Sequence, residues 1–141
     1  MPAGMATNKA DIKHVHWQLR LGEVEPEGGP VVAGYDDINQ AILLIAMTPI
    51  GSVPSNPAKG CDLIPALDKP PAVAIPMICT AVWDAITLWE PRVETQTVSG
   101  KAIDVAHYEI DVPWRVKGDV AAQIQRTTIV IERPQNTVSA P

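Results

Sequence analysis

The sequence predicts an α+β (α/β) fold in which two main helices pack on a mainly antiparallel sheet, with a projecting C-terminal β-hairpin. Three observations predict this class. Apolar residues recur with helical spacing in two segments, residues 37–47 and 75–89. Runs that alternate between apolar and polar residues precede and follow these segments. Fourteen prolines and nine glycines divide the 141 residues into short elements, and this length is typical of one domain.

The first predicted element is a strand. From His14 to Leu21, apolar residues alternate strictly with polar ones, which places Trp17 and Leu19 on the same face of a half-buried strand. The following segment is rich in glycine and proline, and it predicts a turn with a short returning strand at residues 31–32. We expect residues 1–11 to form a flexible arm, residues 12–133 a single domain, and residues 134–141 a polar tail.

A helix is predicted to follow this turn. Asp37 is a plausible N-cap with Gln40 three positions later, which is the spacing of a capping box. Apolar residues occupy nearly all faces of the segment, so we expect the helix to be buried almost all round. Thr48 and Pro49 end it. The proline-rich segment that follows predicts a long, shaped loop with one short helical turn near residues 63–67.

The second main helix is predicted from helical spacing over residues 75–89, with Pro76 at its first helical position. Pro91 disfavours helical geometry at Glu90 and therefore ends the helix. Glu90 and Arg92 at this end admit three interpretations: a catalytic pair, a docking point for a partner, or a solvated helix terminus. Judged from the residues alone, the solvated terminus is favoured.

The C-terminal part contains three strand-like runs, residues 92–98, 101–116 and 122–133. The last two are separated by Lys117, Gly118 and Asp119, a hairpin-type linker, and the apolar phase of the second run shifts near Ala106, which predicts a bulge or a change of packing partner. An outer strand of this hairpin would carry unpaired backbone N–H and C=O groups, and such an edge is a template for another chain. The residues expected in these joining strands are Ile103, Val105, Tyr108, Ile110, Val112, Ile124, Ile129 and Ile131.

Composition and charge argue against several functions. The formal net charge is −5 and lysine and arginine form no run, so we expect no binding to nucleic acid or to an anionic membrane. The longest uninterrupted apolar stretch, residues 41–47, is too short to span a bilayer, and residues 1–13 lack the apolar core of a signal peptide. We therefore expect a protein made in a reducing cytoplasm, where Cys61 and Cys79 would not form a structural disulfide.

Catalytic and metal sites find little support in the residues. His14 and His16 share a strand face, but only His107 remains as a third histidine, and a metal site needs further ligands. No Gly-x-Ser-x-Gly motif or phosphate-binding loop is present. Glu90 could be tested as a glycosidase acid, but the neighbouring Arg92 favours its charged form. We expect no catalytic residue, no metal and no cofactor.

Aromatic residues do not favour a sugar-binding cleft either. They make up 4% of the chain, without any phenylalanine. Of the four tryptophans, Trp17, Trp83 and Trp89 fit positions in the predicted core rather than platforms for a sugar ring. A peptidoglycan hydrolase nevertheless stays open as an alternative function, which incubation of the protein with cell walls would test.

Four groups of residues form motifs that follow one another along the chain: Trp17, Leu19, Leu21 and Gly22; Gly34, Asp36, Asp37, Ile38, Gln40 and Ala41; Thr48, Pro49, Gly51, Ser52, Pro57 and Gly60; and Trp89, Glu90, Pro91, Arg92 and Val93. In this order they resemble the baseplate wedge proteins of contractile phage tails, the W and gene-25-like family of sheath initiators. The resemblance covers about residues 15–98, and Ala58-Lys59 departs from the aromatic residue that the family usually carries before the glycine.

This resemblance implies a structural protein of the tail baseplate in the virion, assembled in the host cytoplasm. It implies six copies around the tail tube, contacts with other wedge proteins and with tube or hub proteins, and C-terminal strands onto which the tail sheath protein adds. It favours the interpretation that Glu90, Pro91 and Arg92 dock to a wedge protein over the interpretation that they form a solvated helix end. A baseplate adaptor of a type VI secretion system or another contractile injection system is the further alternative.

Overall fold

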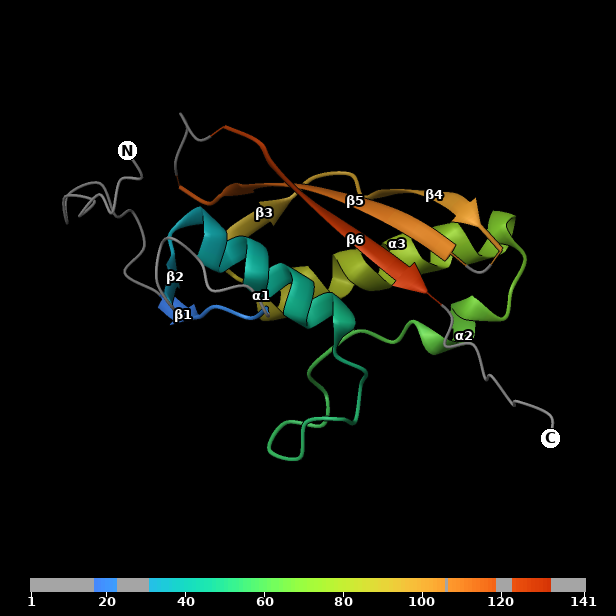
Figure 1. Cartoon of the computed structure of the whole chain (residues 1–141), viewed down its shortest axis with the longest axis horizontal. Coiled ribbons are helices and arrows are strands. Elements are labelled where there is room, and N and C mark those ends of the chain that lie inside the picture. Colours follow the sequence, from blue (N-terminus) through green and yellow to red (C-terminus); the bar gives the residue numbers. More distant parts are fainter. Residues whose placement is uncertain (1–16, 23–30, 106, 119–122, 133–141) are drawn as a thin grey trace. The chain divides into compact units, whose positions relative to one another are not determined.

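The computed structural model describes residues 17–22, 31–105, 107–118 and 123–132 (Figure 1). The described residues belong to two compact units, Met1–Leu44 and Ile45–Pro141. The expected arm at 1–11, the expected tail at 134–141, and His14 and His16 lie outside the described residues, and the single domain over 12–133 stays a prediction. The elements are β1 (Trp17–Leu19), β2 (Val31–Ala33), α1 (Tyr35–Met47), α2 (Ile64–Leu67), α3 (Pro71–Trp89), β3 (Val93–Thr95), β4 (Ser99–Asp104), β5 (His107–Val116) and β6 (Gln125–Glu132).

These elements confirm the predicted α+β class, with helices, antiparallel strands and a C-terminal strand pair. In the first unit, β1 pairs antiparallel with β2, as predicted. The alternation of β1 was predicted correctly but its buried face was not, because Trp17 and Leu19 are 65% and 64% exposed. Gln18 lies between them on the opposite side, and its side-chain amide donates a hydrogen bond to the Asp37 carbonyl oxygen (2.7 Å).

Helix α1 begins at Tyr35, so the prediction of Asp37 as N-cap is wrong. Gly34 has a φ of 65°, and its carbonyl accepts the Ile38 N–H (3.2 Å), which starts the helix earlier. Gln40 does not act as a capping-box residue but connects α1 to β1. Its side chain donates to the Leu19 carbonyl (2.7 Å) and accepts the Leu21 N–H (3.0 Å).

The prediction that α1 is buried almost all round is also wrong. Ile38 and Ile42 are fully buried, whereas Leu44 and Met47 are 39% and 55% exposed. The apolar residues on the second face of α1 are therefore not buried, although the sequence pattern predicts that they are. An amphipathic stripe rather than an all-apolar surface is what buries the helix.

The loop after α1 returns to its own start. Pro49 and Cys61 form an isolated parallel bridge, and the Cys61 N–H donates to the Thr48 carbonyl (2.8 Å). Gly60 has a φ of +130°, and a Cβ atom there would lie 2.2 Å from the Thr48 oxygen. Glycine is therefore required for this close backbone approach. The short helical turn predicted near residues 63–67 is confirmed as α2.

Helix α3 spans Pro71–Trp89, so the prediction that Pro76 opens the helix is wrong. Pro71 takes the first position, and Pro76 lies inside the helix at the cost of one backbone hydrogen bond. The predicted end is confirmed: Glu90 is the C-cap, and its N–H donates to the Ile86 carbonyl (2.8 Å). The buried face of α3 consists of Ala74, Ile78, Val82, Ala85 and Ile86.

By length and composition alone, α3 could cross a membrane: it is 19 residues long, and 28% of its most apolar window is buried. The criterion of an uninterrupted apolar stretch, which selects residues 41–47, does not detect α3, because polar residues interrupt its apolar ones. Core helices of soluble proteins meet the same criterion, and α3 contacts β3 and β4 through its buried face, so length and composition are weak grounds for a membrane span.

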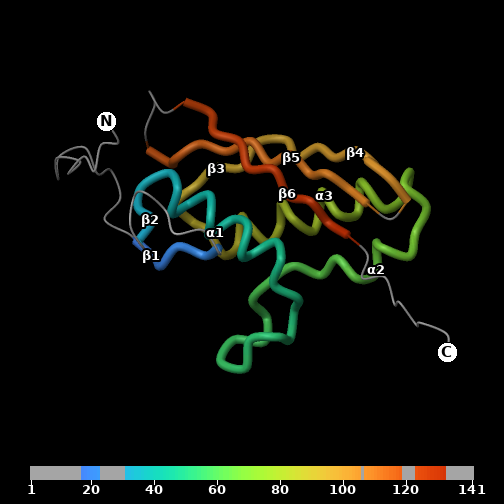
Figure 2. Tube along the Cα trace, viewed as in Figure 1, coloured from blue at the N-terminus to red at the C-terminus, as the bar shows by residue number. Residues whose placement is uncertain are grey.

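The sheet of the second unit is centred on β5 (Figures 1 and 2). Strand β6 pairs with one edge of β5, while β4 and β3 share the other edge, and all pairs are antiparallel. The run 101–116 is therefore two strands, so the prediction of a single strand is wrong. The pairing of β4 with β5 does shift its register between Ala102 and Asp104, close to the position of the predicted bulge or change of packing partner. Ala106 itself lies outside the described residues. The shift in apolar phase marks the point where the chain reverses direction between β4 and β5.

The core of this unit is built on the inner face of the sheet. Alternate residues of β5 are buried, and Trp114 is the largest of them: it is 1% exposed, and its Nε1 donates to Thr127 Oγ1 (2.8 Å). Trp83, predicted as a core residue, is 42% exposed. Gly100 lets α3 approach β4, because a Cβ atom there would lie 2.6 Å from Ile110 Cδ1 and 3.1 Å from Ile75 Cγ2.

Candidate functional site: a strand edge and a helix corner

Strand β6 forms one edge of the sheet in the described part of the chain. It pairs with β5 over eight residues without a register shift, from His107 opposite Glu132 to Trp114 opposite Gln125. Its side chains alternate regularly: Thr127, Ile129 and Ile131 are buried, and the residues between them are exposed. The edge is therefore regular, which suits the addition of another strand.

The hydrogen-bond pattern identifies which backbone groups face outward from β6. The Pro113 carbonyl accepts the Gln96 N–H (2.8 Å), and the Lys117 N–H donates to the Arg92 carbonyl (2.9 Å). The backbone N–H and C=O groups of odd-numbered β5 residues therefore face β3 and β4. Because backbone direction alternates along an antiparallel strand, the even-numbered residues of β5 bond to β6.

Pairing of β5 with β6 then assigns the two sides of β6. Ile110 lies opposite Ile129, and Val112 opposite Thr127, so Thr127 and Ile129 bond to β5. The backbone N–H and C=O groups of Arg126, Thr128 and Val130 face away from the sheet, where no described strand pairs with them. Pro113 does not remove a hydrogen bond to β6, because the N–H that proline lacks would face β3 and β4.

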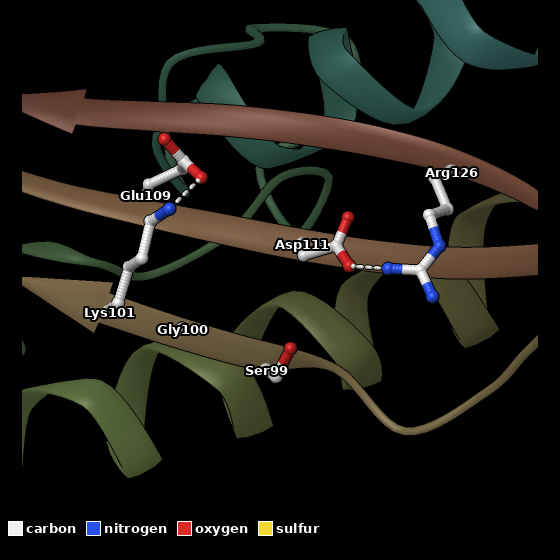
Figure 3. Close-up of a pocket in the computed structure, with 6 residues that line it drawn as sticks. All are labelled: Ser99, Gly100, Lys101, Glu109, Asp111 and Arg126. Carbon is white, nitrogen blue, oxygen red and sulfur yellow. Dashed lines mark hydrogen bonds and ion pairs between the residues drawn. The ribbon is translucent and has the colours of Figure 1, made fainter.

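The outer face of the sheet carries ion pairs between neighbouring strands. Lys101 pairs with Glu109 (2.8 Å) and Arg126 with Asp111 (2.6 Å), on either side of an open hollow of about 360 Å³ (Figure 3). The hydrogen bond with Glu109 raises the pKa of Lys101. These pairs lie close to solvent, so each adds little to stability, but together they hold β4, β5 and β6 in one register.

A further pair joins the ends of β5 and β6. His107 Nε2 lies 2.9 Å from Glu132 Oε1, and this hydrogen bond raises the pKa of the imidazole. Because the pKa is raised in the folded chain, the stabilisation is fully present below the ordinary pKa of histidine. It is lost as the pH rises through the raised value.

Glu90 and Arg92 meet in a bidentate ion pair at the corner after α3. Arg92 Nε donates to Glu90 Oε1 (2.6 Å), and a second guanidinium nitrogen donates to Oε2 (2.8 Å). The Glu90 side chain is 6% exposed and the Arg92 side chain is 18% exposed. Two parallel hydrogen bonds fix this pair more firmly than a single contact would. The corner thus presents a rigid, charge-neutral unit rather than a free acid.

The structure separates the strand residues that the sequence singled out into two groups. Five side chains belong to the core of this chain, namely Tyr108, Ile110, Val112, Ile129 and Ile131. Three are exposed: Ile103 by 53%, Val105 by 86% and Ile124 by 59%. The residues with outward backbone groups, Arg126, Thr128 and Val130, were not singled out. Pro113 indicates which β5 residues lack a backbone donor, but the register of β5 with β6, which the sequence does not contain, is needed to identify them.

Neither cysteine has the features of a reactive group. Cys61 and Cys79 are free thiols. Burial, followed by the nearby carboxylates of Asp62 and Asp84, raises the pKa of Cys61 to about 12, and burial also raises the pKa of Cys79. Thiolates are therefore disfavoured at both positions. In the described residues, no three histidine, cysteine, aspartate or glutamate side chains form a group that could hold a metal ion.

Comparison with known proteins identifies the family. Residues 32–128 match the family model described as baseplate wedge protein gp25. A candidate tail lysozyme from Geobacter sulfurreducens has a similar fold, with 24% identity over 71% of this chain and 93% of that chain, and a TM-score of 0.56. A chain of the baseplate complex from the type VI secretion system matches with 16% identity over 70% of this chain and 92% of that chain, and a TM-score of 0.49.

No curated protein sequence matches the chain. The family model, however, covers more than half of the 141 residues, including α1, α3 and most of the sheet. The chain therefore belongs to the baseplate wedge protein gp25 family and is a baseplate component of a contractile injection system.

Proposed function

We propose that this protein initiates the tail sheath by offering the outer edge of β6 to a strand of the first sheath subunit. The observation that carries the proposal is the outward direction of the backbone groups of Arg126, Thr128 and Val130 along a regular edge. Pairing through the main chain sets direction and register with little dependence on side chains. One joint could thus be repeated from ring to ring by identical sheath subunits.

We further propose that the corner of Glu90, Pro91 and Arg92 docks to another wedge protein. Its support is rigidity: the ion pair is bidentate, and the backbone N–H of Glu90 is bonded to the last turn of α3. In this proposal, six copies surround the tail tube, contact tube or hub proteins, and form part of the virion baseplate. The same joint would serve a type VI secretion system if the chain came from one.

The proposed role is structural rather than enzymatic. A glycosidase acid must reach its substrate and hold a proton, whereas the Glu90 side chain is 6% exposed and accepts two hydrogen bonds from a cation. Incubation of the purified protein with cell walls separates the two functions. Release of soluble fragments would favour a peptidoglycan hydrolase, and no release would favour the structural role.

Thr128→Pro tests the strand joint. Proline removes the outward N–H and is tolerated at an edge, while the bonds from β6 to β5 stay in place. We expect this variant to fold and to join the baseplate, but to leave tails with bare tubes in electron micrographs. Thr128→Ala is the matched control, because it removes the side chain and keeps the N–H, and its tails should carry normal sheath.

Circular dichroism of both variants establishes that the sheet is intact. Normal sheath on tails that carry a folded Thr128→Pro chain would contradict the joint. Bare tubes with both variants would also contradict it, since the side chain rather than the backbone would then be responsible.

A further inference from the structure

Helix α3 has a second apolar face in addition to the one that packs on the sheet. Val73, Met77 and Leu88 are 49%, 38% and 67% exposed. Ala81 and Asp84 lie between them, and the successive spacings of four, four, three and four residues place all five on one stripe. We name these five residues the α3 stripe. A helix that is apolar on two faces normally has a covering element on both.

A hollow lies at the C-terminal end of the α3 stripe. It has a volume of about 280 Å³, and its lining includes Ile50, Cys61, Asp62, Asp84, Leu88 and Trp89. Ala81, Asp84 and Leu88 of the α3 stripe also line the hollow, so the stripe and the hollow adjoin. The charged side chains of this lining are the carboxylates of Asp62 and Asp84, and both contribute, after burial, to the raised pKa of the Cys61 thiol.

In the described part of the chain, none of the ion pairs includes Asp62 or Asp84. The cations of the described ion pairs are Arg92, Lys101, His107, Arg115 and Arg126, and each pairs with a carboxylate other than Asp62 or Asp84. Two neighbouring carboxylates beside apolar side chains favour a basic group flanked by apolar ones. The surface thus defines the chemistry of its partner.

The length of the α3 stripe suits a helical partner. From Val73 to Leu88 a helix rises about 22 Å, or about four turns. A partner helix lying along it would present apolar side chains at positions three and four apart. A free cation or a single basic residue would leave Val73 and Met77 uncovered.

We propose that the α3 stripe docks an amphipathic helix of another baseplate protein, with one of its lysine or arginine side chains between Asp62 and Asp84. This contact is distinct from the β6 edge and does not depend on strand addition. It assigns α3 two tasks in one helix: supporting the sheet through its buried face and binding a wedge neighbour through the other.

Photo-cross-linking in assembled baseplates tests this contact. With p-benzoylphenylalanine in place of Leu88, we expect a cross-link to a helical segment of a different baseplate protein, with a lysine or arginine within one turn of the linked residue. Asp84→Lys added to this chain should lower the yield at least about tenfold, since like charges across an interface are strongly unfavourable. Changing the basic partner residue to glutamate should restore the yield.

Asp36→Lys is the matched control, because it makes the same change in net charge at an exposed acid outside the stripe. It should leave the yield unchanged, as should Thr128→Pro, which affects only the sheath joint. A cross-link to a second copy of this chain, to a segment without a basic residue, or to nothing would overturn the proposal. Flotation of the chain with phosphatidylglycerol vesicles, abolished by Leu88→Glu, would overturn it in favour of a membrane.

Discussion

Arg92→Ala is expected to lower the free energy of unfolding by about 3–5 kcal/mol, because it leaves a buried carboxylate without its cation. Glu90 is 6% exposed, and both of its oxygens accept hydrogen bonds from Arg92. Water cannot readily replace the guanidinium at this corner. Urea unfolding, followed by circular dichroism, measures the loss.

The double variant Glu90→Gln/Arg92→Gln is the control. Neither glutamine is charged, so we expect it to be more stable than Arg92→Ala. Together with the single variants Glu90→Gln and Arg92→Gln, it forms a double-mutant cycle that measures the coupling between the two positions. A loss below about 1 kcal/mol for Arg92→Ala would contradict the buried pair, since this is the range of exposed ion pairs.

The same double variant tests docking at the corner. The docking role that the family resemblance implies predicts that charge reversal at Arg92 leaves the domain folded but unable to join the wedge. The structure gives a reason to expect unfolding instead, because a second carboxylate would lie beside buried Glu90. A folded double variant that fails to join the baseplate supports docking, and normal incorporation contradicts it.

Trp114→Ala is expected to lower the free energy of unfolding by about 3–5 kcal/mol, the usual cost of removing a large aromatic side chain from a core. Trp114 is 1% exposed on the central strand β5. Thermal or urea unfolding measures the change. Because β5 pairs with β3, β4 and β6, we expect one cooperative transition at lower denaturant concentration.

Trp114→Phe separates packing from hydrogen bonding. It keeps an aromatic ring but loses the donor to Thr127 Oγ1, so we expect a smaller loss of about 1–2 kcal/mol. Equal losses for Phe and Ala would contradict the packing argument. A negligible loss for Ala would show that Trp114 does not hold the core.

Several elements were predictable because local signals agreed with the fold. The end of α3 at Pro91 follows from the backbone of the residue before proline, and the short helix at Ile64–Leu67 has a proline in its first turn. Strand β6 was predictable because Thr127, Ile129 and Ile131 alternate with exposed residues. In each case the decisive interaction lies within a few residues.

Other features depend on contacts that a local pattern does not contain. Trp17 alternates like a buried residue, yet its three-residue strand turns that face to solvent. The reversal between β4 and β5, beside a register shift between Ala102 and Asp104, gives the same shift in apolar phase as a bulge within one strand would. Arg92 and Glu90 were recognised as a unit, but their mutual bidentate pairing follows from side-chain geometry at the corner.

Residue-specific amide exchange tests the central proposal most directly, namely that a neighbouring backbone completes the β6 edge. In the isolated chain, we expect the outward amides of Thr128 and Val130 to exchange quickly, and those of Thr127 and Ile129 to be protected by β5. In tails that carry sheath, Thr128 and Val130 should become protected by at least about tenfold. Unchanged exchange at both residues in sheathed tails would contradict the account.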